Sequence, residues 1–210
     1  MTASPAAPAA SPGPRARPFR IVLTGGPGGG KTTAADLYRR EIGEAVVIVR
    51  ESATLLFSGG FPREDTPFAR RAIQQAIYHV QRNLEDVQTA RFPDRILLCD
   101  RGTVDGAAYW PGPSDGFFAA VGSTHAAELA RYDAVLFFES AAVGGIGFEN
   151  GNPARVESIA EAARLDRVLR TLWEPHPRFF FVPHNPSFIK KTLFGLASIE
   201  NIVAQLSTPR

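Results

Sequence analysis

The stretch "RIVLTGGPGGGKTT", residues 20–33, decides the fold. It opens with a mainly apolar run that predicts a short β-strand, and six consecutive glycine or proline residues then precede Lys31. Gly25, Gly30, Lys31 and Thr32 fit the pattern Gly-x-x-x-x-Gly-Lys-Ser/Thr in full. Because this pattern follows a predicted strand and opens a predicted helix, it indicates a loop that wraps the phosphate groups of a nucleotide.

The residue types of this loop suit a nucleotide triphosphate and Mg²⁺. Glycines let the backbone fold tightly with its N–H groups toward phosphate oxygens, and the following helix N-terminus adds partial positive charge. Lys31 is expected to reach the β- and γ-phosphates, Thr32 to bind Mg²⁺, and Thr33 to bond near the α-phosphate. The expected nucleotide-binding residues of the loop are Gly26, Pro27, Gly28, Gly29, Gly30, Lys31, Thr32 and Thr33.

Length and composition are those of an ordinary soluble globular protein of 210 residues, with a hydrophobic content of 44%. The formal net charge of +2 is too small to argue for nucleic acid as a partner. One cysteine, Cys99, allows no intramolecular disulfide, which favours a reducing compartment, and we expect a cytoplasmic protein. The sequence contains no run of about 18 apolar residues, so no membrane span is expected. Peripheral lipid binding and the oligomeric state stay open.

Residues 1–18 are rich in alanine, proline and serine, and we expect a disordered leader followed by one nucleotide-binding domain over residues 19–210. In that domain, continuous apolar runs predict strands buried on both faces of a parallel sheet. These runs cover residues 20–24, 45–49, 95–100, 133–139 and 178–183. Helical patterns cover residues 31–43, 66–91, 103–110, 124–131, 155–174 and 187–207. The alternation predicts a three-layer α/β fold with helices on both faces, in which ligands bind beyond the carboxyl ends of the strands.

An Asp-Arg pair ends the third apolar run. Asp100 is placed to hold Mg²⁺ beside the phosphate-binding loop. Motor ATPases commonly place a glutamate next, whereas Arg101 cannot act as a base but can hold phosphoryl oxygens with its guanidinium fork. The guanine-reading pattern Asn-Lys-x-Asp is absent from the sequence, which lowers the GTPase option without excluding GTP. The alternative for Asp100 and Arg101 is a surface ion pair.

Two carboxylates compete for the role of a base that accepts the proton of an acceptor hydroxyl. Glu51, just after the second run, is the first choice, and Asp105 is the second. Either could instead be a carboxylate favoured at a helix start. Tyr109 and Trp110 could line an acceptor pocket, with packing as the alternative. Gln74, Gln75 and Gln81 could contact a substrate but are interpreted as solvated side chains.

A glycine- and asparagine-rich segment after the fourth run leads into a charged helix, and residues 140–170 are predicted to form a mobile lid. Arg155 is the first choice for a catalytic arginine of this lid, followed by Arg164, Arg167 and Arg170. The alternative is a solvated helix with ion pairs at three- and four-residue spacing. His184 and Asn185, after the fifth run, are expected near the nucleotide base.

Several segments together resemble a known family: "GGPGGGKTT", "VRESA", "LLCDRGTVDGAAYW", "RVESIAEAARLD" and "HPRFFFVPHNPSFIKK". They are similar to the P-loop nucleotide kinase-like family related to the ribosylnicotinamide kinase domain, often labelled AAA-type ATP-binding domains, over about residues 19–207. The resemblance implies a five-stranded parallel sheet in the order 2-3-1-4-5, ATP or GTP with Mg²⁺, and a small-molecule acceptor. By similarity, Lys31, Thr32, Asp100 and Arg101 take the phosphate, metal and phosphoryl roles, and Glu51 matches the carboxylate near the acceptor.

The sequence therefore predicts a Mg²⁺-dependent P-loop phosphotransferase that acts on a hydroxyl of a small metabolite, with a nucleoside as one option. Two alternatives stay open. One is a nucleotide-dependent regulatory switch, of which a phosphoinositide-binding protein is one form, and the other is a simple NTPase. The residues do not indicate the acceptor or the preferred base.

Overall fold

A five-stranded parallel sheet organises the chain in the computed structural model, which describes residues 17–144 and 158–207. Its strand order is β2-β3-β1-β4-β5, and every pair of neighbouring strands is parallel. The strands are β1 (Arg20–Thr24), β2 (Val46–Val49), β3 (Ile96–Asp100), β4 (Ala134–Phe138) and β5 (Phe179–Val182). The expected order 2-3-1-4-5 is confirmed, and each predicted strand is present with ends shifted by at most one residue.

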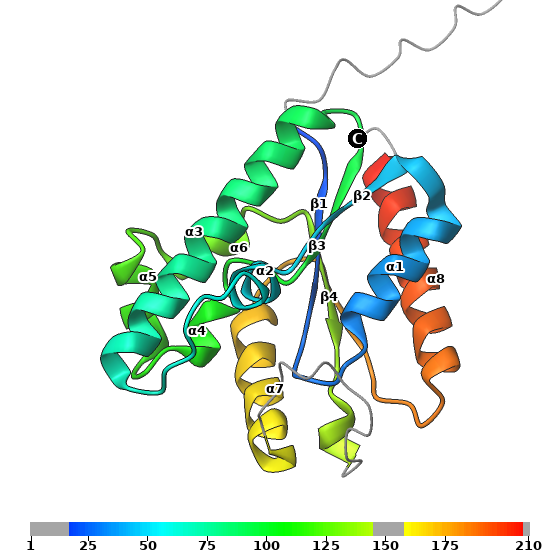
Figure 1. Cartoon of the computed structure of the whole chain (residues 1–210). Coiled ribbons are helices and arrows are strands. Elements are labelled where there is room, and N and C mark those ends of the chain that lie inside the picture. The colour runs from blue at the N-terminus through cyan, green and yellow to red at the C-terminus, as the bar shows by residue number, and fades with distance from the viewer. Residues whose placement is uncertain (1–16, 145–157, 208–210) are drawn as a thin grey trace, which may run out of the picture.

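Helices cover both faces of the sheet, as predicted (Figure 1). On one face, α1 (Lys31–Ile42) and α8 (Phe188–Ser207) pack over a core that includes Ile21, Leu98 and Leu136. The other face carries α3 (Pro67–Arg91), α4 (Gly106–Tyr109), α5 (Ser114–Ala120), α6 (His125–Leu129) and α7 (Ile159–Trp173). Successive strand residues point to opposite faces, so strands that are apolar throughout bury side chains in both cores.

Two short helices were not predicted: α2 (Ser52–Ser58) and α5. Both border segments rich in glycine and proline, GGFP after α2 and PGP before α5, and such segments indicate a turn or loop in a sequence pattern. Other helix ends follow recognisable caps, since Thr66 accepts from the Ala69 N–H at the start of α3 and Ser158 from the Glu161 N–H at the start of α7. Short 3₁₀ helices, η1 (Gly43–Ala45) and η2 (Ala141–Gly144), complete the described elements.

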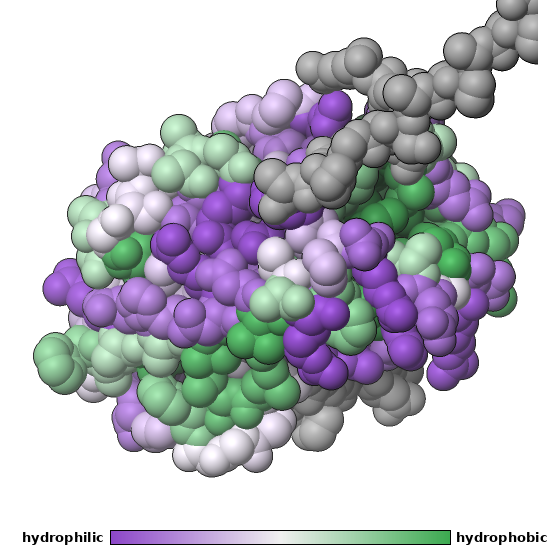
Figure 2. Space-filling view, turned by 90° about the horizontal axis from the view of Figure 1, so that it is seen from above, coloured by the Kyte–Doolittle hydropathy of each residue, from purple (hydrophilic) through white to green (hydrophobic). Residues whose placement is uncertain are grey.

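The register of the strands brings their carboxyl ends to one edge of the sheet. Leu23 of β1 pairs with Asp100 of β3, and Thr24 pairs with Phe137 of β4. The loops that follow these strands therefore lie side by side at the lower end of Figure 1. Figure 2 looks onto the opposite end, where hydrophilic and hydrophobic residues share the surface. Among the described helices, none has the length and hydropathy needed to cross a membrane.

Candidate functional site

The loop between β1 and α1 has a backbone that requires glycine. Gly25, Gly28 and Gly30 adopt φ angles of 127°, 73° and 84°, a region that other residues rarely enter. Neighbouring atoms also leave no room for a side chain, because a Cβ on Gly25 would collide with the Phe138 carbonyl and one on Gly30 would lie 2.5 Å from the Phe188 ring. The loop thus has the tight curvature that a phosphate-binding backbone needs.

Lys31 opens α1 and is buried, with 3% of its surface exposed. Its Nζ donates to the carbonyl oxygens of Gly25 at 2.9 Å and Gly26 at 2.7 Å, so the ammonium lies over the loop itself. This positive charge and the N-terminus of a helix 12 residues long favour negative charge at the same place. The residues present therefore fit a nucleotide phosphate group.

Thr32 and Asp100 meet beside the loop. The Thr32 hydroxyl donates to Asp100 Oδ2 at 2.7 Å, and Asp100 is only 2% exposed. Burial, with the charge of Glu51 as a second cause, raises the pKa of Asp100, which the Thr32 hydrogen bond opposes. Hydroxyl and carboxylate oxygens are ligands that Mg²⁺ prefers, usually together with phosphate oxygens and waters. Within residues 17–144 and 158–207, no group of three or more His, Cys, Asp or Glu residues is placed to hold a metal by itself.

Arg101 joins three loops at this edge of the sheet. Its Nε donates to Glu51 Oε1 at 3.2 Å, and one terminal nitrogen donates to the Gly25 carbonyl at 2.7 Å and to Asp105 Oδ2 at 3.1 Å. Its φ is 80°, an uncommon backbone conformation for a non-glycine residue that costs roughly 1–2 kcal/mol. The side chain is 11% exposed. The alternative of a surface ion pair for Asp100 and Arg101 is therefore wrong.

The two candidate bases differ in their surroundings. Asp105 is buried, and its Oδ1 accepts from the Thr24 hydroxyl at 2.8 Å and from Trp173 Nε1 at 2.7 Å, while Oδ2 accepts from Arg101. Glu51 accepts from Arg101 through Oε1 and from the Thr54 hydroxyl through Oε2 at 2.6 Å. The Glu51 side chain keeps 24% of its surface exposed, against 8% for Asp105. Glu51 is thus the more accessible carboxylate.

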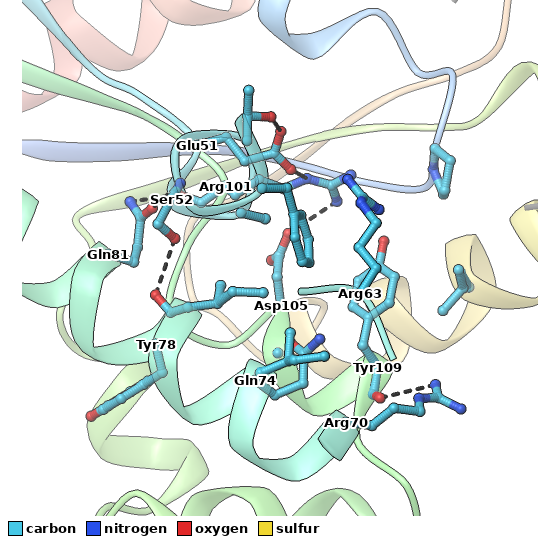
Figure 3. A pocket seen from close by; sticks show the side chains of 18 of the residues that line it. Glu51, Ser52, Arg63, Arg70, Gln74, Tyr78, Gln81, Arg101, Asp105 and Tyr109 are labelled. Atoms are coloured by element: carbon cyan, nitrogen blue, oxygen red, sulfur yellow. Dashed lines mark hydrogen bonds and ion pairs between the residues drawn. The ribbon is translucent and has the colours of Figure 1, made fainter. Parts of the chain in front are cut away.

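A cavity of about 680 Å³ adjoins the phosphate-binding loop. Its wall runs from Pro27 of the loop across α2, α3, α4 and α7. In Figure 3, Glu51 and Arg101 lie on one side of this cavity, and Gln74 and Arg70 lie on the opposite side. Of the two aromatic residues expected at an acceptor pocket, Tyr109 lines the cavity. Trp110 instead packs edge-on against Phe117, with ring centroids 5.6 Å apart.

Asp166 of α7, which the sequence analysis did not single out, supports the phosphate-binding loop from outside. Its Oδ1 accepts the backbone N–H of Gly26 and that of Ser140, each at 2.8 Å, and Asp166 is 3% exposed. The Ser140 hydroxyl in turn donates to the Pro27 carbonyl. A signal was present in the sequence, because Asp166 lies on the apolar face of a helix that also presents Ala162, Leu165 and Leu169.

Lys191 of α8 is a second support that the sequence analysis missed. Its Nζ donates to the carbonyl of Gly29 at 2.9 Å and to that of Glu139 at 2.6 Å. Burial lowers the pKa of Lys191 to about 8. Both ends of the loop are therefore tied to helices that follow β4 and β5 in the chain.

The interpretation of Gln81 as a solvated side chain is wrong. Gln81 is 2% exposed, accepts from the Ser52 N–H at 3.3 Å, and donates to the carbonyl of Arg101 at 3.3 Å. It fixes the loop after β3 to the start of α2. Gln74 lines the cavity, and Gln75 is half-buried without lining it.

The expected lid, residues 140–170, is described except for residues 145–157, which include Arg155, the first choice among its arginines. Arg164 pairs with Glu161 at 2.7 Å, and Arg170 pairs with Glu174 at 3.3 Å. These pairs have the three- and four-residue spacing of the solvated-helix alternative. Arg167 is also exposed.

The loop between β5 and α8 contains the two residues expected near the nucleotide base. The His184 N–H donates to the Glu139 carboxylate at 2.7 Å, and Asn185 Oδ1 accepts from the Ser187 N–H at 2.8 Å. Phe188, which follows, lies against Gly30. The loop with Asn185 thus leads directly to a residue that contacts the phosphate-binding loop.

Comparisons with known proteins agree with this geometry. No curated protein matches the sequence. Among solved structures, a thymidylate kinase from Ehrlichia chaffeensis superposes with a TM-score of 0.56 and 16% sequence identity, over 88% of this chain and 98% of that one. At this identity the likeness shows a shared fold. A family model described as "AAA domain" matches residues 20–186, from the first residue of β1 to the loop after β5. Since this match spans most of the chain, the protein belongs to the AAA domain family and has a P-loop kinase-like fold.

Proposed function

We propose that the protein is a Mg²⁺-dependent phosphotransferase that moves the γ-phosphoryl group of ATP to a hydroxyl of a small metabolite. The observation that carries the proposal is the cavity of about 680 Å³ that shares Pro27, Arg101 and Glu51 with the phosphate-binding site. A hydrolase needs room for a water molecule only, whereas a kinase needs an acceptor site beside the donor. GTP could replace ATP as the donor.

The donor half of the site consists of the loop residues 26–33. In the proposal the backbone N–H groups of residues 28–33 and Lys31 bind the phosphates, since Pro27 has no N–H and the Gly26 N–H donates to Asp166. Asn185 lies near the base. Thr32 and Asp100 would hold Mg²⁺, which when bound neutralises charge on the phosphate oxygens.

The single cysteine, Cys99, is buried and free, which supports the proposed cytoplasmic location.

In the acceptor half of the site, we assign the proton transfer to Glu51. The acceptor oxygen forms a bond to the γ-phosphorus, the bond from that phosphorus to the β–γ bridging oxygen breaks, and the hydroxyl proton passes to the Glu51 carboxylate. Asp105 is less suited because all three hydrogen bonds given above hold it in place. Arg101, together with Arg155 of the proposed lid, stabilises the charge on the transferred group.

A metabolite-library screen tests the proposal. The protein is incubated with Mg²⁺, ATP and pooled alcohols, and mass spectrometry looks for products heavier by one phosphoryl group. Lys31→Ala should lose ATP binding and transfer. Glu51→Gln should keep ATP binding and lose roughly 10²–10⁴-fold in transfer rate, as removal of a general base does. ATP consumption that yields inorganic phosphate alone, with every pool present, would refute the kinase assignment in favour of a simple NTPase.

A further inference from the structure

The charge of the cavity wall restricts what the cavity can bind. Carboxylates outnumber guanidinium groups among the described residues that line it. The acidic residues are Glu51, Glu64, Asp65, Asp105 and Glu161, and the basic residues are Arg63, Arg70 and Arg101. An acceptor that already carries a phosphate would bring further negative charge into an acidic site, next to the phosphates of the donor.

The arginines of the wall are also engaged with protein groups. Arg101 contacts the carboxylates of both Glu51 and Asp105. Arg70 donates to the backbone carbonyl of Tyr109 at 3.1 Å. The Arg63 guanidinium lies over the ring of Phe57, 3.8 Å from its centroid. Beside the phosphate-binding loop, where the accepting group has to lie, the positive charge is therefore balanced by two carboxylates. A neutral hydroxyl suits this end of the cavity better than a phosphate dianion.

Part of the cavity wall is apolar. Phe57 of α2, Ile73 and Ile77 of α3, and Leu165 of α7 contribute side chains to the wall. A volume of about 680 Å³ lies within the range of roughly 300–1,000 Å³ that is usual for sites of organic ligands. Apolar side chains from three helices offer a dry contact surface to a flat ring, which a small polyol would not use.

Gln74 provides a hydrogen-bonding group on the side of the cavity opposite Glu51 (Figure 3). Its Oε1 lies 3.4 Å from the place that a Cβ on Gly106 would take, so the amide lies next to the start of α4. Among the described residues, the Gln74 amide forms no hydrogen bond within the protein. It can therefore offer one donor and one acceptor side by side to a ligand.

We propose that the cavity takes an unphosphorylated nucleoside and that Gln74 selects it by hydrogen bonds to the edge of its base. The sugar hydroxyl would lie at Glu51, the ring between the apolar side chains, and the ring edge at Gln74. The expectation that the nucleoside hydroxyl is phosphorylated rests on the proposed function. The expectation that the nucleoside binds rests on the cavity alone, so binding and phosphorylation can be tested separately.

The experiment compares nucleosides with their own 5′-monophosphates. Binding to the whole protein is measured by calorimetry in the presence of Mg²⁺ and a non-hydrolysable ATP analogue, and transfer from ATP is followed by mass spectrometry. At least one common nucleoside should bind at least tenfold more tightly than its monophosphate. Gln74→Ala should weaken this binding roughly tenfold, as expected for the loss of one to two neutral hydrogen bonds. Gln75→Ala, on the same helix but not on the cavity wall, should leave the binding unchanged.

Each result separates the two proposals. Tighter binding and faster phosphorylation of monophosphates would overturn the nucleoside inference while leaving a phosphotransferase. Absence of nucleoside binding in protein that binds the ATP analogue would also overturn it. Nucleosides that bind in a Gln74-dependent way but are never phosphorylated would support the inference and refute the proposed function. Equal losses in Gln74→Ala and Gln75→Ala, at equal urea midpoints, would remove the role given to Gln74.

Discussion

Two replacements of Asp166 distinguish the effect of its hydrogen bonds on stability from the effect of its charge. Asp166→Ala leaves the buried N–H groups of Gly26 and Ser140 without the acceptor that now lies 2.8 Å from each. An unsatisfied buried N–H costs about 1–3 kcal/mol. Part of this loss is offset because burial of the carboxylate is itself unfavourable, as its raised pKa indicates. We therefore expect the free energy of unfolding to fall by about 3 kcal/mol, which for a domain of this size lowers Tm by roughly 6–12 °C.

Asp166→Asn is the matched control, because its amide oxygen can take the place of Oδ1 and accept the same two N–H groups. This variant should lose about 1 kcal/mol or less. Urea unfolding at neutral pH measures both variants, with the m-value checked for a constant unfolded state. The Ala variant should also bind ATP more weakly, since the Gly26 end of the phosphate-binding loop is no longer held. Equal stability of Asp166→Ala and the wild type, or equal losses in the two variants, would show that the two hydrogen bonds of Asp166 do not stabilise the loop.

Three further predictions concern the same edge of the sheet. Because burial lowers the pKa of Lys191 from 10.5 to about 8, the unfolded chain binds more protons than the folded one between these values, so stability should rise with pH there. Lys191→Met should remove this contribution, and urea unfolding at pH 8 and pH 10 checks it. Gly30→Ala should weaken ATP binding at least tenfold, as measured by calorimetry. Alanine disfavours the φ of 84° at this position, and its Cβ would collide with the Phe188 ring. Arg101→Lys should keep ATP binding but slow transfer, since an ammonium cannot reproduce the guanidinium fork, and single-turnover kinetics measures this.

The fold could be predicted largely from short-range patterns. Continuous apolar runs between helical patterns are typical of parallel strands, and all five strands were located from them. The strand order came from the family resemblance, because periodicity does not tell which strands are neighbours. Helices α2 and α5 were not predicted because each borders a segment rich in glycine and proline, which indicates a loop.

Residues of the candidate site could be predicted from the sequence where they belong to one contiguous motif, and were missed where their partners are distant in the sequence. The phosphate-binding loop is contiguous in the sequence, so its residues could be named from one motif. Asp166 and Gln81 act on backbone groups that lie 140 and 20 residues away from them. A polar side chain on a helix gives no sign of such a partner until the fold places it, and only its position on an apolar face was available as a signal. Arg155 lies outside the described residues, so its role stays a prediction.

The fate of the γ-phosphoryl group distinguishes a phosphotransferase from a simple NTPase. Phosphorus NMR of the protein with Mg²⁺, ATP and a mixture of nucleosides distinguishes a new phosphate ester from inorganic phosphate in one measurement. For a phosphotransferase with Glu51 as its base, we expect an ester signal that grows as the γ-phosphate signal falls. This ester signal should be lost in Glu51→Gln while ATP binding remains. Growth of the inorganic phosphate signal alone would show hydrolysis and not transfer, and an ester signal that grows at an unchanged rate in Glu51→Gln would exclude Glu51 as the base.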